Sequence, residues 1–433
     1  LWGRQHRLAE TLRCTCDGRG EVGKVTYKSA GDARDGSGEA LVAAKLEAEA
    51  PQLGALLTTF GAASPWSQTL TGLIENKGAV KLGVDLNVQP KVTTFESMAL
   101  RIGSASLAGS GSIAQNDSGQ VFDLKLSGEN LALLAPHGSD GWSTKILAFA
   151  MPRKTSGALA LSLKDTVLGG IAVPTATLKA QVKSGGLSLN LGEVGAFGGT
   201  WEGDVERREG NTGLLASAKV KARDLDLQAF LAAALGTSGL TGQGDLSFSV
   251  SADGKSWKSL VENSAGMLGL KASNGTARGF DLPGFSAGLK DASGELGARL
   301  VVEGALSSGA TKYTNLEAEM TLADGKLRAI SLTGALEGGS LTGEGEIDLA
   351  SLSRKGRTVI DLTDYEGLPK FRNVLLGPLK KPQTVWDAEE LVLKFTEAWL
   401  LSNQTKQMPD LPGSDGVSVT AEELDDLAAP DKQ

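Results

Sequence analysis

The sequence contains few of the residues from which catalytic and metal sites are built. Its 433 residues include two cysteines and two histidines, and aromatic residues make up 5% of the chain. Two histidines leave almost no material for a metal site or for histidine-dependent catalysis. Cys14 and Cys16 cannot make a disulfide framework and are interpreted as incidental thiols, with a local redox or metal role as the alternative. We therefore expect no enzyme, with no catalytic residue, no cofactor and no metal.

Long apolar runs and basic clusters are also missing. No run of 18 apolar residues occurs, so no segment is predicted to cross a membrane as a helix. The net charge is −8, and residues 403–433 carry −5 of it. Lysine and arginine are scattered, without the basic stripe that nucleic-acid binding requires. Nucleic acid is therefore excluded as a partner, and the acidic tail is predicted to be disordered.

Glycine, by contrast, is abundant, with 57 of 433 residues, about 13% against a usual value of about 7%. The glycines have no three-residue period, which excludes a collagen, and 41% hydrophobic residues are enough for a core. Period-2 alternation dominates, as in Leu246-Ser-Phe248-Ser-Val250, and strands recur about every 10 to 15 residues. This pattern predicts an all-β meander. Short helices are predicted at about 51–60, 226–235, 255–264 and 388–402.

Three segments of the chain resemble one another as hairpins. Glycine turns at Gly103, Gly198 and Gly338 each precede a strand with further glycines, which we expect on one face with apolar residues on the other. A strand followed by a short helix also recurs, at 40–61 and at 214–236. The hairpin turns are 95 and 140 residues apart, so a solenoid with a fixed rung is not supported.

The repeats also predict how the chain is divided. It starts with Leu1 and a polar, arginine-containing segment that is no signal peptide, and the first hairpin stands partway into a repeat. We interpret the chain as a fragment of a longer protein. The predicted parts are an atypical leader at 1–19, a repetitive β-sheet at 20–239, a second β region at 240–385, an amphipathic helix at 386–402 and the tail at 403–433. The helix is expected to cap the end of the sheet, with docking to a membrane or partner as the alternative.

An alternating strand has one apolar face that must be removed from water, and four short helices cannot cover about twenty strands. Either the sheet packs on a second sheet, as in a sandwich, or it curls into a trough filled by something apolar. Sandwich cores usually contain bulky aromatics, which are sparse here, while small aliphatics and strand glycines favour a wide, curved lining. We predict a mainly β fold: a long, twisted antiparallel sheet that forms an open, U-shaped trough, with a few short helices.

The most specific motifs lie in the C-terminal half of the chain. Leu240 starts a strand with Thr-Gly-Gln-Gly, Asn274 starts an Asn-Gly pair in the next one, and Gly279 starts a Gly-Phe-Asp-Leu run. A Leu376-Gly-Pro-Leu-Lys-Lys-Pro segment precedes the final helix. This pattern resembles the C-terminal region of AsmA-family proteins, closely over 240–385 and loosely over about 20–400.

The resemblance implies a periplasmic envelope protein of Gram-negative bacteria, anchored in the inner membrane by an N-terminal helix that this sequence lacks. The family is related to TamB and to bridge-like lipid transfer proteins. Its β-sheet groove is implicated in moving phospholipids toward the outer membrane and in outer-membrane biogenesis. The implied partners are phospholipid acyl chains in the groove, the inner membrane, and outer-membrane or other envelope proteins.

We predict the lining of the groove from the strands with the clearest alternation, as a hypothesis about which side chains face inward. The predicted lining residues are Leu187, Leu189, Leu191, Leu246, Phe248, Val250, Leu268 and Leu270. Two alternatives to lipid conduction stay open: a structural factor in outer-membrane protein assembly, and a β-rich surface adhesin.

One motif resembles a hydrolase site. Gly284-Phe-Ser286-Ala-Gly288 matches the nucleophile elbow, which needs a strand-to-helix turn and a histidine partner. His6 and His137 are the two histidines, one in the atypical leader and one in a Pro-His-Gly loop. The match is therefore interpreted as chance.

Overall fold

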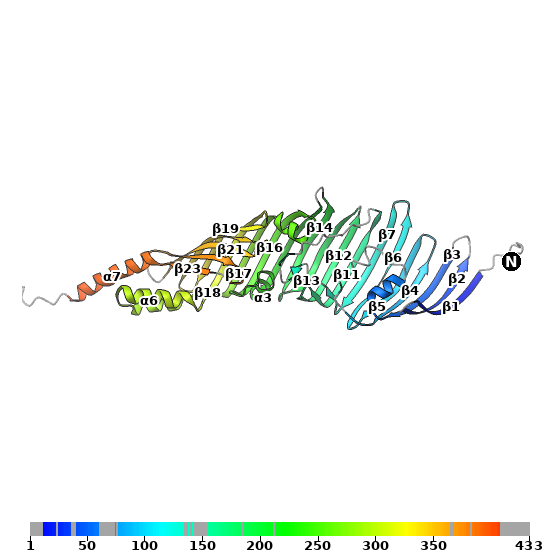
Figure 1. The fold of residues 1–433 in the computed structure, drawn as a ribbon, viewed down its shortest axis with the longest axis horizontal. Helices are drawn as coiled ribbons and strands as arrows, with labels where there is room; N and C mark the ends of the chain where they lie inside the picture. The colour runs from blue at the N-terminus through cyan, green and yellow to red at the C-terminus, as the bar shows by residue number, and fades with distance from the viewer. Residues whose placement is uncertain are drawn as a thin grey trace, which may run out of the picture.

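The computed structural model describes residues 12–22, 25–35, 40–59, 74, 77–133, 137–138, 141–142, 154–183, 185–210, 213–363, 368–381 and 383–407. In this part of the chain, 21 strands form one long, open sheet and two short strands form a separate pair. Figure 1 shows the twisted sheet running along the longest axis of the molecule, with two helices at its C-terminal end. The predicted mainly β, open-sheet fold is confirmed, and the sandwich alternative is wrong for these residues.

The first seven strands form an antiparallel meander, in which each strand pairs with the next one along the chain. These strands are β1 (Leu12–Val22), β2 (Val25–Asp35), β3 (Ala40–Ala50), β4 (Val80–Val88), β5 (Val92–Ile102), β6 (Ala105–Asn116) and β7 (Gly119–Glu129).

The meander is interrupted once by a parallel connection. β11 (Thr155–Leu168) lies parallel to β7 and to the short β8 (Ala132–Leu133). The segment between them contains β9 (His137–Gly138) and β10 (Gly141–Trp142), which pair with each other. A parallel neighbour requires a crossover connection instead of a tight turn, which explains this longer excursion.

From β11 onward the sheet is antiparallel again, and each strand pairs with the next. The remaining strands are β12 (Ile171–Lys183), β13 (Gly186–Ala196), β14 (Gly199–Glu209), β15 (Leu214–Asp226), β16 (Leu240–Gly254), β17 (Ala265–Arg278), β18 (Ala310–Ala323), β19 (Lys326–Leu336), β20 (Gly339–Asp348), β21 (Ser353–Leu362), β22 (Phe371–Pro378) and β23 (Gln383–Asp387).

Four helices stand where the sequence predicts them. They are α1 (Leu53–Thr59), α3 (Leu227–Leu235), α4 (Trp257–Glu262) and α7 (Glu389–Gln407). The boundaries of α3 follow from its caps, because the Asp226 side chain accepts a hydrogen bond from the backbone N–H of Ala229 and Gly236 ends the helix at a φ of 68°. α7 buries Leu391 and Val392 in the core at the end of the sheet, as expected for a cap.

Two helices were not predicted: α5 (Leu282–Asp291) and α6 (Gly294–Ser307). Five glycines in these segments lower their intrinsic helix propensity. Packing stabilises the helices instead, since Phe285 and Leu289 of α5 and Ala298 of α6 are almost fully buried in the same core as Phe371 of β22. Tertiary burial therefore overrides local propensity here.

The strand glycines lie on the opposite face from the one expected. In β6, Gly109 and Gly111 share the face of Leu107 and pair with Leu126 and Leu124 of β7. A Cβ at Gly111 would stand 2.6 Å from the Leu124 side chain, so glycine is required where the neighbouring leucine leans over the strand. The prediction of glycine on one face and apolar residues on the other is wrong. The glycines and the apolar residues follow each other at every second position of the strand, so they point to the same face.

The predicted division of the chain differs from the sheet that forms. Strand β1 starts at Leu12, inside the predicted leader at 1–19. β15 and β16 pair across the predicted boundary at 239/240, so the sheet is continuous there. α7 ends at Gln407, which extends the predicted helix at 386–402. Most of the predicted tail, residues 408–433, lies outside the described residues.

Candidate functional site

The predicted lining residues of β13 lie on one face and pair with the next strand. Leu189 and Leu191 are in register with Val205 and Gly203 of β14, and Leu187 lies two residues further along the same face. Residues directly opposite each other in an antiparallel pair point to the same side of the sheet. The three leucines therefore present one continuous apolar surface.

The other five predicted residues occupy the same face of β16 and β17. Leu246 pairs with Leu270 and Phe248 pairs with Leu268, while Val250 follows on β16. β15 lies between β14 and β16 and pairs with both strands. The register of these pairings places the leucines of β13 and the five residues of β16 and β17 on the same face of the sheet. The structure thus brings all eight predicted residues together.

A row of register partners extends this face over thirteen strands. Its members, in spatial order from β3 to β18, are Leu46, Val84, Met98, Gly109, Leu126, Leu161, Leu178, Leu191, Gly203, Val220, Phe248, Leu268 and Met320. At about 4.8 Å between strands, the row is about 58 Å long. We call the side of the sheet that carries this row the apolar face, and the opposite side the polar face.

Burial changes across the width of the apolar face. We call the long edge where β15 ends at Asp226 the α3 edge, and the one where β16 ends at Gly254 the α4 edge. On β15, Leu225, Ala222 and Val220 are 0%, 1% and 3% exposed, whereas the residues of this face nearer the α4 edge are half-buried. On β15 the face is therefore closed near the α3 edge and more open toward the α4 edge.

Helices close the α3 edge. In the part of the chain that the structure describes, α1 contacts β3, α3 contacts β15 and β16, α5 contacts β18, and α7 contacts β22. At Gly244 of β16, an added Cβ would stand 2.6 Å from the Leu227 side chain of α3, which shows that the helix lies on the apolar face. Figure 1 shows α3 and α6 along one long edge of the sheet. α4 packs on β16 at the opposite edge.

An aromatic cluster lies where α3 meets the sheet. The ring centroids of Phe197, Trp201 and Phe230 are 5.6 to 6.2 Å apart, and the Trp201 indole N–H donates to the carbonyl of Ala196 at 3.3 Å. Phe248, a predicted lining residue, and these three aromatic residues pack against the same buried residues, Ala222, Leu225 and Leu246. Sequence reasoning missed this cluster because its members come from a hairpin turn and a helix as well as a strand.

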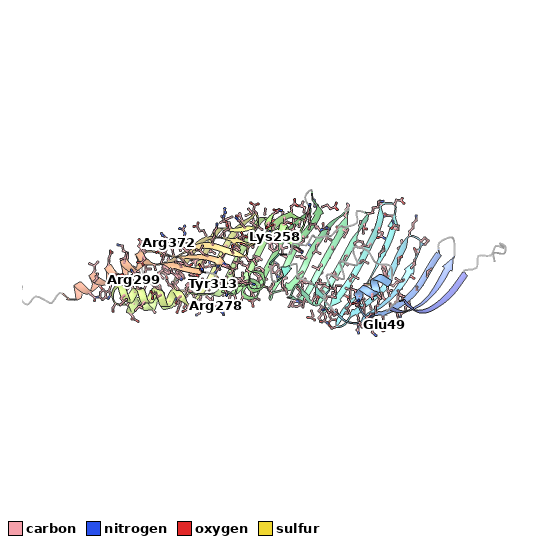
Figure 2. All side chains as sticks on the ribbon, viewed as in Figure 1. Glu49, Lys258, Arg278, Arg299, Tyr313 and Arg372 are labelled. Carbon is pink, nitrogen blue, oxygen red and sulfur yellow. The ribbon has the colours of Figure 1, made fainter. Side chains whose placement is uncertain are left out.

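The polar face carries cross-strand ion pairs. Arg223 pairs with Glu202 at 2.7 Å, and Arg328 with Glu346 at 2.9 Å. The Arg328 guanidinium, together with Lys355, holds the pKa of Glu346 below its usual value. Figure 2 labels charged residues on several elements, among them Glu49, Lys258 and Arg372. The two faces therefore differ sharply in chemistry.

A shallow hollow lies on the polar face over β15 to β19, with a volume of about 480 Å³. The hollow forms where Ser247 has a small side chain and Gly269 has none. Charged side chains such as Lys271 and Glu317 surround it. Lys271 and Glu317 already pair with each other at 3.7 Å. The hollow is thus a gap between surface ion pairs.

Two arginines stand on the apolar face near the α4 edge. Arg207 of β14 pairs in register with Leu187 and with Ala216, and Arg354 of β21 pairs with Ile347 and Gly377. Burial lowers the pKa of both guanidinium groups, and for Arg207 the nearby Glu209 opposes this shift. Sequence reasoning missed both arginines, although each is separated by an even number of residues from apolar residues of its own strand and therefore faces the same side of the sheet.

The serine of the hydrolase-like motif, Ser286, lies in a helix. Ser286 is in the interior of α5 and is 4% exposed, so it does not occupy the strand-to-helix turn of a nucleophile elbow.

Among the described helices, none is both long and apolar enough to cross a membrane.

In comparisons with known proteins, the chain matches no family model, and no curated protein or solved structure shows significant similarity to it. The resemblance to AsmA-family proteins therefore remains a prediction from the motifs.

Proposed function

We propose that this protein is an AsmA-like, non-enzymatic protein of the bacterial cell envelope that binds or conducts phospholipids along its apolar face. The observation that carries the proposal is the continuous row of thirteen register partners, over which no second sheet packs in the described part of the chain. The leucines of this face on β13 and β17 are half-buried. Soluble monomers rarely leave so large an apolar surface open, so such a surface indicates a ligand or a partner.

The dimensions of the face suit an acyl chain. Half of a hydrocarbon core of about 30 Å corresponds to about 15 Å per acyl chain, which is the length of about five residues of a strand at about 3.3 Å each. Each buried methylene contributes about 0.8 kcal/mol. Since the lining changes little from strand to strand, a bound chain can shift along the row by exchanging one set of leucine and valine contacts for the next.

The proposed place of action is the periplasm, between the inner and outer membranes. Phospholipid is the proposed ligand, with its acyl chains on the apolar face, and the proposed process is outer-membrane biogenesis. The support for the location is the motif resemblance, and the support for the ligand is the chemistry of the face. The charged, ion-paired polar face remains in water in this arrangement.

Native mass spectrometry of the protein purified without detergent tests the proposal. We expect bound phospholipid in the wild type and much less in Leu189→Asp and Phe248→Asp, because each variant places a carboxylate among the lining side chains. Ser247→Asp is the matched control, since Ser247 adjoins Phe248 but belongs to the polar face. Unchanged lipid in both lining variants contradicts the proposal.

A wild-type protein without bound lipid also contradicts it. That result favours the alternatives of a structural role in outer-membrane protein assembly or an adhesive surface.

A further inference from the structure

Charged residues are rare on the apolar face. Between β4 and β22, the charged residues at register positions of this face are Arg207, Glu209 and Arg354. Both cations are arginines, and both stand within three residues of the strand end at the α4 edge. On β13 and β15 the residues of the apolar face toward this edge are half-buried.

The surroundings of Arg354 leave its charge poorly compensated. Its register neighbours Ile347 and Gly377 are uncharged, and its Nε is buried without a hydrogen-bond partner. Burying a guanidinium without an anion is unfavourable. Arg207 is also partly buried, and Glu209 on the same face offsets part of its charge. Arg354 therefore gains most from an anion.

On the polar face of the same two strands, arginines form ion pairs with glutamates. On β21 itself, Arg357 belongs to the polar face and forms an ion pair of 2.7 Å with Glu344. On β14, Arg208 pairs with Glu206 at 2.6 Å. Position on the apolar face, and not the presence of arginine in the strand, therefore distinguishes Arg207 and Arg354.

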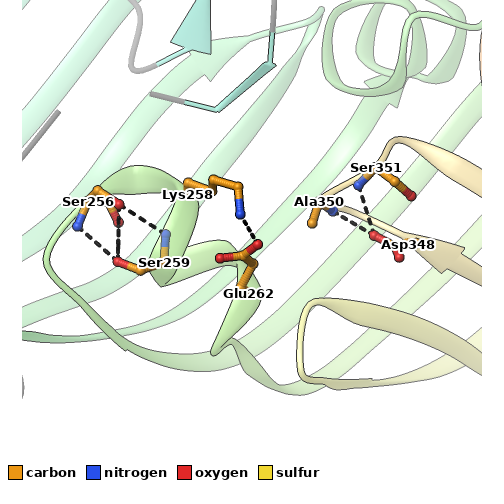
Figure 3. Close-up of polar contacts among 7 residues, drawn as sticks. All are labelled: Ser256, Lys258, Ser259, Glu262, Asp348, Ala350 and Ser351. Atoms are coloured by element: carbon orange, nitrogen blue, oxygen red, sulfur yellow. Dashed lines mark hydrogen bonds and ion pairs between the residues drawn. The ribbon is translucent and has the colours of Figure 1, made fainter. Parts of the chain in front are cut away.

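The α4 edge suits a polar head because it is polar, and of the described helices only α4, on β16, packs there. Figure 3 shows two local structures at this edge. In one, Ser256 caps α4 by accepting from the backbone N–H of Ser259, and in the other Asp348 accepts from the backbone N–H groups of Ala350 and Ser351. An acyl chain that lies on the face toward the α3 edge leaves its head at this polar edge.

We propose that Arg207 and Arg354 each hold the phosphate group of a bound phospholipid at the α4 edge. The inference rests on the proposed function and adds to it the class of headgroup and its position. A planar guanidinium donates two parallel hydrogen bonds to phosphate oxygens, which makes arginine suited to this group. Seven strand spacings, about 34 Å, separate the two positions, so they serve different lipid molecules or successive positions of one.

The test compares two fluorescent lipids with the same acyl chains, one a phosphatidylglycerol and the other an uncharged diacylglycerol. We expect wild-type protein to bind the phosphatidylglycerol more tightly. Arg354→Gln should weaken that binding about tenfold, with a smaller loss for Arg207→Gln, and leave diacylglycerol binding unchanged. Arg357→Gln and Arg208→Gln are matched controls on the polar face of the same strands. Arg354→Lys, which keeps the charge, should retain part of the preference.

Each outcome decides a separate question. If wild type binds neither lipid, the proposed function fails together with this inference. If wild type binds both equally and Arg354→Gln changes neither, the headgroup assignment alone is overturned. Inorganic phosphate without lipid is the third probe. Competition by phosphate against phosphatidylglycerol but not against diacylglycerol supports the assignment, whereas tight binding of phosphate alone that Arg354→Gln abolishes assigns a free-phosphate site instead.

Discussion

The hydroxyl of Tyr313 donates a hydrogen bond of 2.5 Å to the backbone carbonyl of Thr241, two strands away in the sheet. The ring of Tyr313, on β18, passes over Gly275 of β17 to reach β16, and a Cβ at Gly275 would collide with the phenol. Tyr313 is 2% exposed. One side chain thus connects three strands at the α3 edge, where the apolar face is closed.

The substitution Tyr313→Phe should lower the free energy of unfolding by about 1 kcal/mol, because the hydrogen bond to Thr241 is lost while the ring still fills its site. Gly275→Ala should cost more, since the added methyl displaces the ring. Urea unfolding followed by circular dichroism measures both. A Tyr313→Phe variant as stable as wild type would show that the bond contributes nothing net.

The same tyrosine makes stability depend on alkaline pH. Burial raises the pKa of Tyr313 above its ordinary value, so the unfolded chain loses this proton first, near pH 10. The contribution is therefore fully present below about pH 10 and declines as the pH rises through the folded pKa. The stability difference between wild type and Tyr313→Phe should narrow in urea unfolding as the pH rises above about 10. A constant difference contradicts the assignment.

Gly109→Ala should destabilise the sheet by about 1–3 kcal/mol, because a Cβ there would stand 2.8 Å from the Leu126 side chain and press on the backbone of β7. Gly83→Ala is the matched control: it is also a strand glycine, with open space around an added Cβ. That variant should be neutral or slightly stabilising. Thermal unfolding of the two variants checks the contrast, and equal melting temperatures would contradict the steric explanation.

Phe285→Ala should lower the free energy of unfolding by about 3–5 kcal/mol. Phe285 is 0% exposed and its ring centroid lies 5.3 Å from that of Phe371, so it fastens α5 to the end of the sheet. Leu296→Ala on α6 is the control, because Leu296 is 72% exposed. Near-ultraviolet circular dichroism reports on the aromatic core around Phe371 and Trp386. Similar losses in both variants would contradict this account of the core.

Much of the fold could be predicted from local patterns. The alternation Leu187, Leu189, Leu191 predicts a strand with one apolar side, and the structure has that strand. Asp226 and Gly236 predict where α3 begins and ends. These features depend on residues that are neighbours in the chain. They can therefore be predicted without knowing which distant segments of the chain pack against them.

Other features depend on partners distant in the sequence. Bulges shift the register of β13 against β12 and β14, so strict alternation does not carry through Val194. α5 and α6 are glycine-containing segments that become helical against Phe371. The aromatic cluster around Trp201 and the pairing of β7 with β11 likewise join separated segments.

The sequence by itself determined that the chain forms many amphipathic strands with one apolar side, because alternation is a local property of the backbone. Tertiary structure decided that the apolar sides join into one face, that helices cover it along the α3 edge, and that Arg207 and Arg354 stand near the α4 edge. The physical reason is register: which residues share a face and a neighbour follows from strand pairing, which long-range packing selects.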